Sequence, residues 1–305
     1  MTRRQGLNYG DEGKGRPMMT LMTLLVLAMR AVVLPMGLGL ALCADPALAT
    51  VEPAQPERTD GEIRTADDLL RELERTGESV TRFSATVRYV KTFAIAGDTE
   101  TRDGSLVFVT DPADDGATPR RRFLIEFDRL TVGRRVEQKP QTYVFDGRWL
   151  LERLPSEKQI VKREVVPPGE RWDPLRLGEG PFPVPVGQRR EDVLREFSAE
   201  LLPAGDGLES EALRAYAADC WQLRLTPHAE LADNADFEEV RVWYDRTDLL
   251  PRVVRTVSPS GDESLVQLRE VRTNDAVRVD ERAMSTDLPA KRDGWAIKVE
   301  PWQAK

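Results

Sequence analysis

Residues 143–151 read Tyr-Val-Phe-Asp-Gly-Arg-Trp-Leu-Leu. The dipeptide Asp146-Gly147 is favoured in the two-residue turns of β-hairpins, because both central positions of such a turn need positive φ angles. Apolar runs flank the dipeptide on both sides, at 143–145 and 149–151. The stretch therefore predicts two antiparallel strands joined by a tight turn.

Alternation of apolar and polar side chains continues on both sides of this hairpin. It recurs at 83–93, 106–109, 123–127 and 160–166 and, after a break, at 221–225, 240–244, 252–257 and 265–271. A period of two places successive side chains on opposite faces of a strand. About ten such strands predict a mainly β (α+β) protein built on a curved antiparallel sheet, which either closes into a barrel or stays partly open.

Helical signals lie at the start and in the middle of the folded region. Thr65 is a predicted N-cap, Asp67 and Asp68 suit the positive end of a helix, and Gly77 can end that helix. Residues 167–187 form a Pro- and Gly-rich apolar loop, and helices are expected at 190–202 and 209–218. A weak last strand is expected at 277–284. We expect the helices and the loop to cover the concave face of the sheet.

The N-terminal region has the pattern of an export signal. Arg30 precedes an apolar run, and Ala47-Leu48-Ala49 supplies the small residues that signal peptidase needs. We therefore expect a signal peptide at 1–49, with Met29 as an alternative start, then a flexible leader at 50–62. The body of the protein is expected in the periplasm.

Two alternatives remain open for this segment. Residues 18–42 are long enough to stay uncut as an inner-membrane anchor, although Arg30 interrupts them. Cys43 is a site for lipid attachment, although Leu42 stands where a small residue is preferred.

Composition excludes several classes of function. The chain has 305 residues and a net charge of −8, which disfavours nucleic-acid binding. One histidine cannot build a site with several imidazole ligands, and the two cysteines leave Cys220 without a disulfide partner once the signal is removed. We expect no catalytic residues, no metal, no cofactor and a monomer. A hydrolase that works with carboxylates alone remains the least favoured alternative.

The order of these pieces resembles the periplasmic outer-membrane lipoprotein carrier (LolA/LolB-like) family. The resemblance rests on Phe83-Ser-Ala-Thr-Val87, on Arg121-Arg-Phe-Leu-Ile-Glu-Phe127 and on the hairpin at 143–149. It continues with Val240-Arg-Val-Trp-Tyr-Asp245, Leu250-Pro251 and Ser260-Gly261-Asp262. It spans residues 63–288 and leaves a C-terminal tail at 289–305.

The resemblance implies an unclosed β-barrel whose apolar cavity holds the acyl chains of a lipoprotein, with no chemical step. The partners it implies are lipoprotein acyl chains or another lipid. The alternative is an envelope sensor or protein-interaction module of the same fold, with a membrane-protein partner. The residues expected to line the cavity are Val87, Tyr89, Phe93, Phe123, Ile125, Phe127, Tyr143, Phe145, Trp149, Trp221, Leu223, Val240, Val242 and Tyr244. The residues expected in the lid are Leu175, Leu177, Phe182 and Val184.

Other features have a plain interpretation beside a functional one. The aromatic residues fit an ordinary core as well as a cavity, because a period of two shows a shared face and not an empty space. Cys220 is expected to be structural and His228 to lie in a solvated loop. The acidic group at 233–239 lacks the spacing of a calcium loop. Arg120-Arg-Arg122 either meets lipid headgroups or protects an exposed strand.

Overall fold

Twelve strands in the described part of the chain form one sheet. The computed structural model describes residues 62–112, 119–167, 185–232, 235–290 and 293–303. All of these belong to the larger of two compact units, Asp45–Lys305. A first meander comprises β1 (Arg82–Thr92), β2 (Thr99–Asp111), β3 (Arg120–Val132), β4 (Arg135–Phe145), β5 (Trp149–Leu154) and β6 (Gln159–Glu164).

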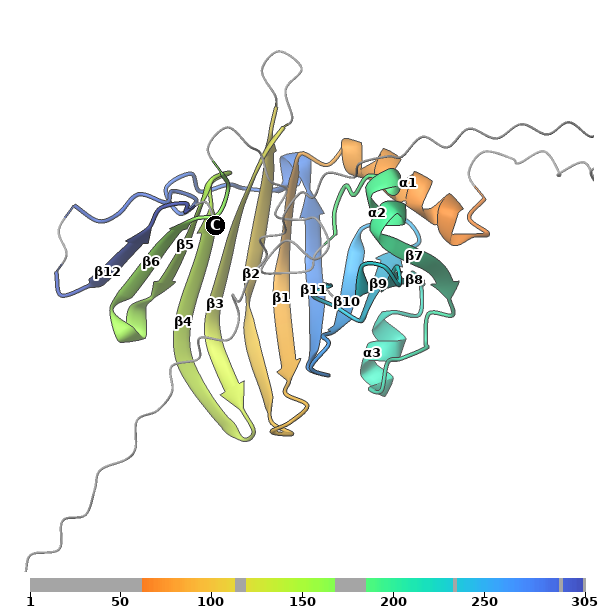
Figure 1. Cartoon of the computed structure of the whole chain (residues 1–305), viewed down its shortest axis with the longest axis horizontal. Coiled ribbons are helices and arrows are strands. Elements are labelled where there is room, and N and C mark those ends of the chain that lie inside the picture. The colour runs from red at the N-terminus through yellow and green to blue at the C-terminus, as the bar shows by residue number, and fades with distance from the viewer. Residues whose placement is uncertain (1–61, 113–118, 168–184, 233–234, 291–292, 304–305) are drawn as a thin grey trace, which may run out of the picture. The chain divides into compact units, whose positions relative to one another are not determined.

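A second meander runs back toward the first. Its strands are β7 (Phe197–Leu202), β8 (Cys220–Pro227), β9 (Glu239–Asp245), β10 (Pro251–Val257) and β11 (Glu263–Thr273). The antiparallel pair β1–β11 joins the two meanders, and β12 (Ala296–Glu300) adds to β6 in parallel. The strand order is β12-β6-β5-β4-β3-β2-β1-β11-β10-β9-β8-β7, so the sheet has two ends and is unclosed (Figure 1). The predicted mainly β, unclosed antiparallel sheet is confirmed.

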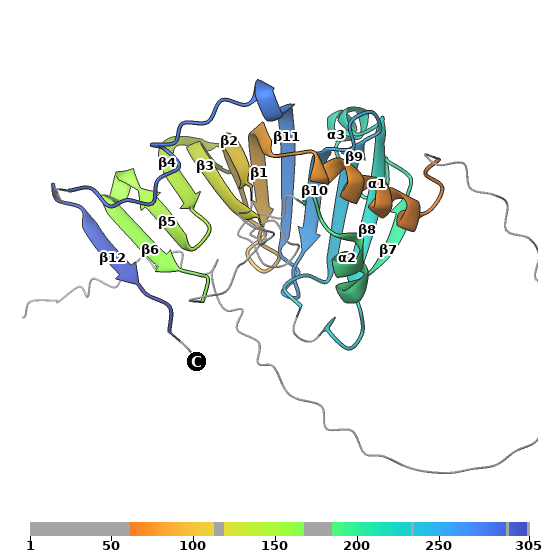
Figure 2. The same cartoon turned by 90° about the horizontal axis from the view of Figure 1, so that it is seen from above.

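The helices of the described region lie on opposite faces of this sheet. They are α1 (Ala66–Glu78), α2 (Arg190–Glu196) and α3 (Glu211–Tyr216). The side chains of α1 and α2 pack on the face that bears Phe83 and Val242, which we call the inner face. Those of α3 pack around Trp243 on the other side, the outer face. Figure 2 shows α1 and α2 gathered at the β7–β10 end.

The hairpin quoted at the start is confirmed as the turn between β4 and β5. The Asp146 Oδ1 atom accepts hydrogen bonds from the backbone N–H groups of Arg148 and Trp149, at 2.9 and 2.8 Å. Gly147 has a φ of 100°, which a residue with a side chain adopts only with strain. The strands are longer than the alternation indicated, since β4 already begins at Arg135.

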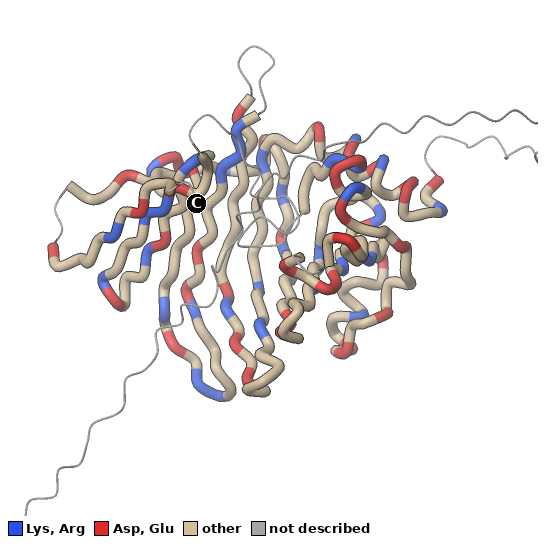
Figure 3. The backbone as a smooth tube through the Cα atoms, viewed as in Figure 1, with Lys and Arg blue, Asp and Glu red and all other residues tan. Residues whose placement is uncertain are grey.

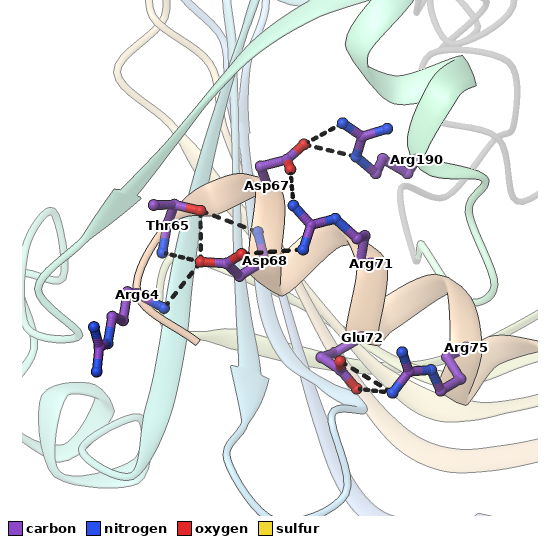
Figure 4. Close-up of polar contacts among 8 residues, drawn as sticks. All are labelled: Arg64, Thr65, Asp67, Asp68, Arg71, Glu72, Arg75 and Arg190. Atoms are coloured by element: carbon purple, nitrogen blue, oxygen red, sulfur yellow. Dashed lines mark hydrogen bonds and ion pairs between the residues drawn. The ribbon is translucent and has the colours of Figure 1, made fainter. Parts of the chain in front are cut away.

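Helix α1 begins where the sequence predicts. The Thr65 side chain accepts a hydrogen bond from Asp68 N at 3.1 Å, and the Asp68 carboxylate accepts one from Thr65 N, also at 3.1 Å (Figure 4). This reciprocal capping box satisfies N–H groups that the first helical turn leaves free. The helix continues past Gly77 and ends at Glu78. The hydrogen of Gly77 allows a close approach, because a Cβ atom there would lie 2.2 Å from the Cα of Gly187.

The helix expected at 190–202 is shorter than predicted. It ends at Glu196, and the next residues form β7, which pairs with β8. Phe197 and Leu201 are four residues apart. Residues at this spacing lie on the same face of a helix, and also on the same face of a strand because the spacing is even. Pairing with β8 decides between the two, since it places Leu201 opposite Leu223 on the inner face.

The strand expected at 277–284 is absent from the described residues, and the tail supplies one instead. The Asp280 Oδ1 atom accepts hydrogen bonds from Arg282 N and Ala283 N, which turns the chain there. Met284 then packs on the outer face. Farther on, β12 continues the sheet beside β6 within the region expected to be a tail.

Candidate functional site

The inner face of the sheet carries most of the side chains predicted to line a cavity. The buried members of this inner-face cluster are Val87, Phe123, Ile125, Phe127, Phe145, Leu223, Val240, Val242 and Tyr244. Tyr89, Tyr143 and Trp221 are half-buried and pack against them. Phe123 and Phe145 stack with ring centroids 5.5 Å apart, and Tyr89 lies 6.3 Å from Phe127. The period of two therefore gathers these residues from both meanders on one apolar surface.

Phe93 and Trp149 lie outside this cluster. Along β5 the side chains alternate, and Leu150 joins the inner cluster while Leu151 joins an outer one. Trp149 shares the face of Leu151, where the Lys162 ammonium lies 5.0 Å from its ring. Phe93 follows the last residue of β1, in the loop that leads to β2. Both residues were predicted to line the cavity because they are aromatic. The alternation of side chains along β5 places Trp149 on the other face, and Phe93 lies beyond the end of β1.

A pocket opens between the helices and the sheet at the β8–β10 end of the inner face. Its empty volume is about 430 Å³, which includes space open to solvent. Leu70, Leu73, Thr76 and Gly77 of α1, Val193 of α2 and the segment 185–188 form one side of it. Leu223, Leu225, Tyr244 and the turn residues Leu249, Leu250 and Pro251 form the other. Most residues of the walls are apolar, with Thr76 and Gln188 as polar members.

Sequence reasoning missed most of this pocket. Of the predicted cavity residues, only Leu223 and Tyr244 line it. The apolar stripe of α1 was visible at helical spacing, but nothing in the sequence showed which strands it covers. The expected lid residues Leu175, Leu177, Phe182 and Val184 lie outside the described residues, as does the expected signal peptide at 1–49.

Arg121 connects the pocket border to the sheet. Its guanidinium donates hydrogen bonds to the carbonyl oxygens of Val186 and Gly187, at 3.5 and 3.3 Å. It also lies 5.8 Å from the ring of Phe108. Arg122, on the other face, donates to both carboxylate oxygens of Asp111, at 2.7 and 2.9 Å. Arg121 and Arg122 therefore both have partners within the chain.

Polar groups interrupt the inner face beside the aromatic residues. The Tyr89 hydroxyl lies 3.1 Å from Ser264 Oγ, and the Gln141 amide donates to Glu152 at 2.9 Å and to the Tyr143 hydroxyl. Burial raises the pKa of Tyr89 and of Tyr143, and the charge of Glu152 raises that of Tyr143 further. Both phenols are therefore neutral near pH 7 and act as hydrogen-bonding groups.

The remaining candidate residues are held in the fold. Burial, and next the charge of Asp245, raise the pKa of the Cys220 thiol to about 11, so it is protonated and unreactive near pH 7. His228 is half-buried, with its Nε2 atom 3.0 Å from the Leu194 carbonyl oxygen. Glu239 pairs with Arg241 and Arg255. Within the described ranges, no three side chains of the metal-binding types come together.

The comparisons with known proteins find likeness at the level of structure. No family model matches the chain, and no curated protein sequence matches it. An uncharacterized conserved protein from Thermus thermophilus is 14% identical, over 78% of this chain and 99% of that one, with a TM-score of 0.40. A LolA superfamily protein from Nitrosomonas europaea is 11% identical, over 73% of this chain and 99% of that one, with a TM-score of 0.31.

A third structure is the MucA/MucB complex of Pseudomonas aeruginosa. It is 15% identical, over 72% of this chain and 60% of that one, with a TM-score of 0.37. One of these neighbours bears the name of the group that the sequence resembles. In the described part of the chain, no helix is both long and apolar enough to cross a bilayer.

Proposed function

We propose that this protein binds an apolar ligand, such as the acyl chain of a lipid or lipoprotein, on the inner face of its sheet. The observation that carries the proposal is the apolar pocket between α1, residues 185–188 and β8–β10. It continues into a face of buried aliphatic and aromatic side chains. A carrier needs such a surface on one side of a stable sheet.

The mechanism is burial of the chain and involves no chemical step. Apolar area removed from water contributes about 25 cal/mol per Å², so one sequestered acyl chain supplies several kcal/mol. The N-terminal pattern of Arg30, an apolar run and Ala47-Leu48-Ala49 supports export, and we place this activity in the periplasm. An exported carrier would protect an apolar chain from water between membranes.

Release of the ligand requires the pocket border to move. The border at 185–188 is held by the two hydrogen bonds of Arg121 and by the close approach of Gly77 to Gly187. Both hydrogen bonds are long, at 3.3 and 3.5 Å, which makes them weak. We propose this border as the part that opens for loading and release.

The test is mass spectrometry of lipid that stays bound after export and detergent-free purification. Thr76→Trp fills the mouth of the pocket from the half-buried last turn of α1. We expect about tenfold weaker lipid binding, equivalent to about 1.4 kcal/mol. Arg75→Trp is the matched control, because the Arg75 side chain is 66% exposed in the same turn.

The results of this test decide between a lipid carrier and a protein-interaction module. Bound lipid in the wild type and in Arg75→Trp, but not in Thr76→Trp, supports the carrier. A wild type that holds no lipid and takes up none from vesicles overturns it. Specific capture of one envelope protein by that lipid-free chain would then favour the interaction module.

A further inference from the structure

Arg102 stands on the inner face of β2, two residues from Glu100 on the same face. It lies opposite Tyr89 of β1 and Leu130 of β3 in the sheet register. Directly paired residues of antiparallel strands project from the same face, so Arg102 shares the face of Tyr89. The next inner-face position along β2 is Gly104, opposite Phe127. A guanidinium therefore stands at the edge of the aromatic part of the inner-face cluster.

One nitrogen of the Arg102 guanidinium lacks a partner in the described part of the chain. The Nη1 atom is buried and donates no hydrogen bond, although the residue as a whole is half-buried. Three other basic side chains on this face have partners, two of them carboxylates and one of them backbone. Arg163 meets Glu300 at 2.6 Å, Lys91 meets Asp262 at 3.9 Å and Arg121 bonds the backbone at 186–187.

A buried guanidinium nitrogen without a hydrogen bond destabilises a folded protein, because the N–H group loses its hydration and gains no partner in return. Replacing it with an apolar side chain would remove that cost. Arg102 therefore has no structural explanation among its described neighbours. A ligand group that accepts its hydrogen bonds would supply one.

The chemistry of that group follows from the donor. A guanidinium presents parallel N–H groups that match the two oxygens of a carboxylate or a phosphate. The hydroxyls of Tyr89 and Tyr143 lie on the same face and stay protonated, since burial raises the pKa of both. The Tyr143 hydroxyl is already engaged by Gln141 and Glu152, and that of Tyr89 lies 3.1 Å from Ser264 Oγ. The adjoining Phe127 and Phe123 are buried in the apolar cluster of this face.

We propose that Arg102 binds the anionic group of an amphiphile, a carboxylate or a phosphate, whose apolar chain lies along the inner face. This inference rests on the proposed function and names the class of ligand. It also gives the ligand an orientation, with its charged end at the β1–β2 pair.

The test compares ligands that share a chain and differ in charge. Dodecanoate and dodecanol are titrated below their aggregation limits into the exported, delipidated chain by calorimetry, at a pH well above the pKa of a carboxylic acid. We expect the wild type to prefer dodecanoate, and Arg102→Met to lose about tenfold to a hundredfold in dodecanoate affinity. Dodecanol affinity stays unchanged. Dodecyl phosphate is expected to follow dodecanoate.

Controls separate this inference from a structural role of the side chain. Arg88 stands on the outer face of the adjoining β1, 3.5 Å from Asp103, and Arg88→Met should bind both ligands like the wild type. Arg102→Lys should keep part of the preference for dodecanoate. The melting temperature of Arg102→Met should equal or exceed that of the wild type, because an unpaired charge has been removed.

Each other outcome has one meaning. Equal affinity of the wild type for dodecanoate and dodecanol overturns the anion site but leaves the proposed function standing. An equal loss of both ligands in Arg102→Met, or a lower melting temperature, also overturns the anion site. Displacement of dodecanoate by equimolar acetate would overturn the proposal that the ligand is an amphiphile, because acetate has no long apolar chain. Binding of neither ligand to any variant overturns the proposed function itself.

Discussion

The two faces of the sheet differ in how completely the chain covers their apolar side chains and pairs their charged ones. On the outer face, apolar clusters are covered by α3 and by the segment around Met284, and charged side chains stand in paired rows. Glu239, Arg255 and Glu263 form one such row, with contacts at 3.3 and 2.7 Å. Basic and acidic residues are interspersed along the strands (Figure 3). On the inner face, a pocket and a buried Arg102 nitrogen without a hydrogen bond remain.

This difference separates a surface that stabilises from a surface that binds. Selection for stability alone would fill the pocket and replace Arg102 with an apolar residue, as on the outer face. The outer face also keeps one unsatisfied buried atom, Oε1 of Gln222, which pairs with Trp243 in the sheet register. The pocket and the Arg102 nitrogen, however, lie on the face where the proposed ligand lies. Substitutions on the two faces should therefore separate stability from binding.

The largest effect is expected at Gly104, where the inner face meets the bulge between β2 and β3. A Cβ atom there would lie 1.9 Å from the Glu126 carbonyl oxygen, so the backbone itself must move. We expect Gly104→Ala to lower the free energy of unfolding by about 3 kcal/mol or more, measured by urea denaturation. Gly205→Ala is the control, because its nearest contact is a side-chain carbon at 4.0 Å. Equal stability of the two variants would refute the close approach.

A pair of leucine truncations compares the faces directly. Leu151 is fully buried on the outer face, and Leu225 is 1% exposed beside the pocket. Truncation to alanine should cost each variant about 2–5 kcal/mol of unfolding free energy. Only Leu225→Ala enlarges the pocket, so only it should change the chain-length preference in a lipid-binding assay. A change in preference in Leu151→Ala would abolish the distinction between the faces.

The sequence predicts the sheet better than the site for a physical reason. The turn at Asp146-Gly147 and the alternation around Phe123 are local properties, set by φ angles and by side-chain period. They therefore indicate strands and faces without knowledge of the neighbours. Even so, Trp149 shows the limit of residue type as a guide, because its strand position decides its face.

The pocket depends on contacts between distant segments. Leu73, Val186 and Leu225 become neighbours only after α1 and the segment at 185–188 have packed on β8. The unpaired state of Arg102 is equally invisible in a sequence where arginine is abundant. Phe197 and Leu201 satisfy both helical and strand spacing, and only the pairing with β8 resolves them. Such features require the tertiary structure.

A smaller effect is expected when a paired charge is removed from the outer face. Arg255 contacts Glu239 and Glu263 and is 19% exposed, so Arg255→Met leaves two carboxylates without this partner. We expect a loss of about 1 kcal/mol in chemical denaturation, with lipid binding unchanged. Arg102→Met should show the opposite pattern, with no loss of stability and weaker binding of an anionic ligand. Identical patterns in the two variants would contradict the assignment of the two faces.

The smallest effect concerns the ion pairs that join the two helices over the pocket. Asp67 of α1 accepts a hydrogen bond from Arg190 of α2 at 2.6 Å, and Arg71 contacts it as well (Figure 4). Burial alone would raise the pKa of Asp67, but the hydrogen bonds from Arg190 and Arg71 outweigh it and lower the pKa. A lowered folded-state pKa stabilises the protein above the unfolded value, and this contribution is lost as the pH falls through the folded value.

The pH dependence of stability therefore tests whether this link holds the helices together. We expect Asp67→Asn to unfold with about 0.5 kcal/mol less free energy than the wild type at neutral pH, because the pair is about one-third exposed. The difference should shrink as the pH falls below the ordinary range of an aspartate, because the wild type loses the same charge. Glu74→Gln, on the same helix, should show no such convergence in parallel denaturation curves. A constant gap between Asp67→Asn and the wild type at every pH would mean that the carboxylate charge does not stabilise the cover of the pocket.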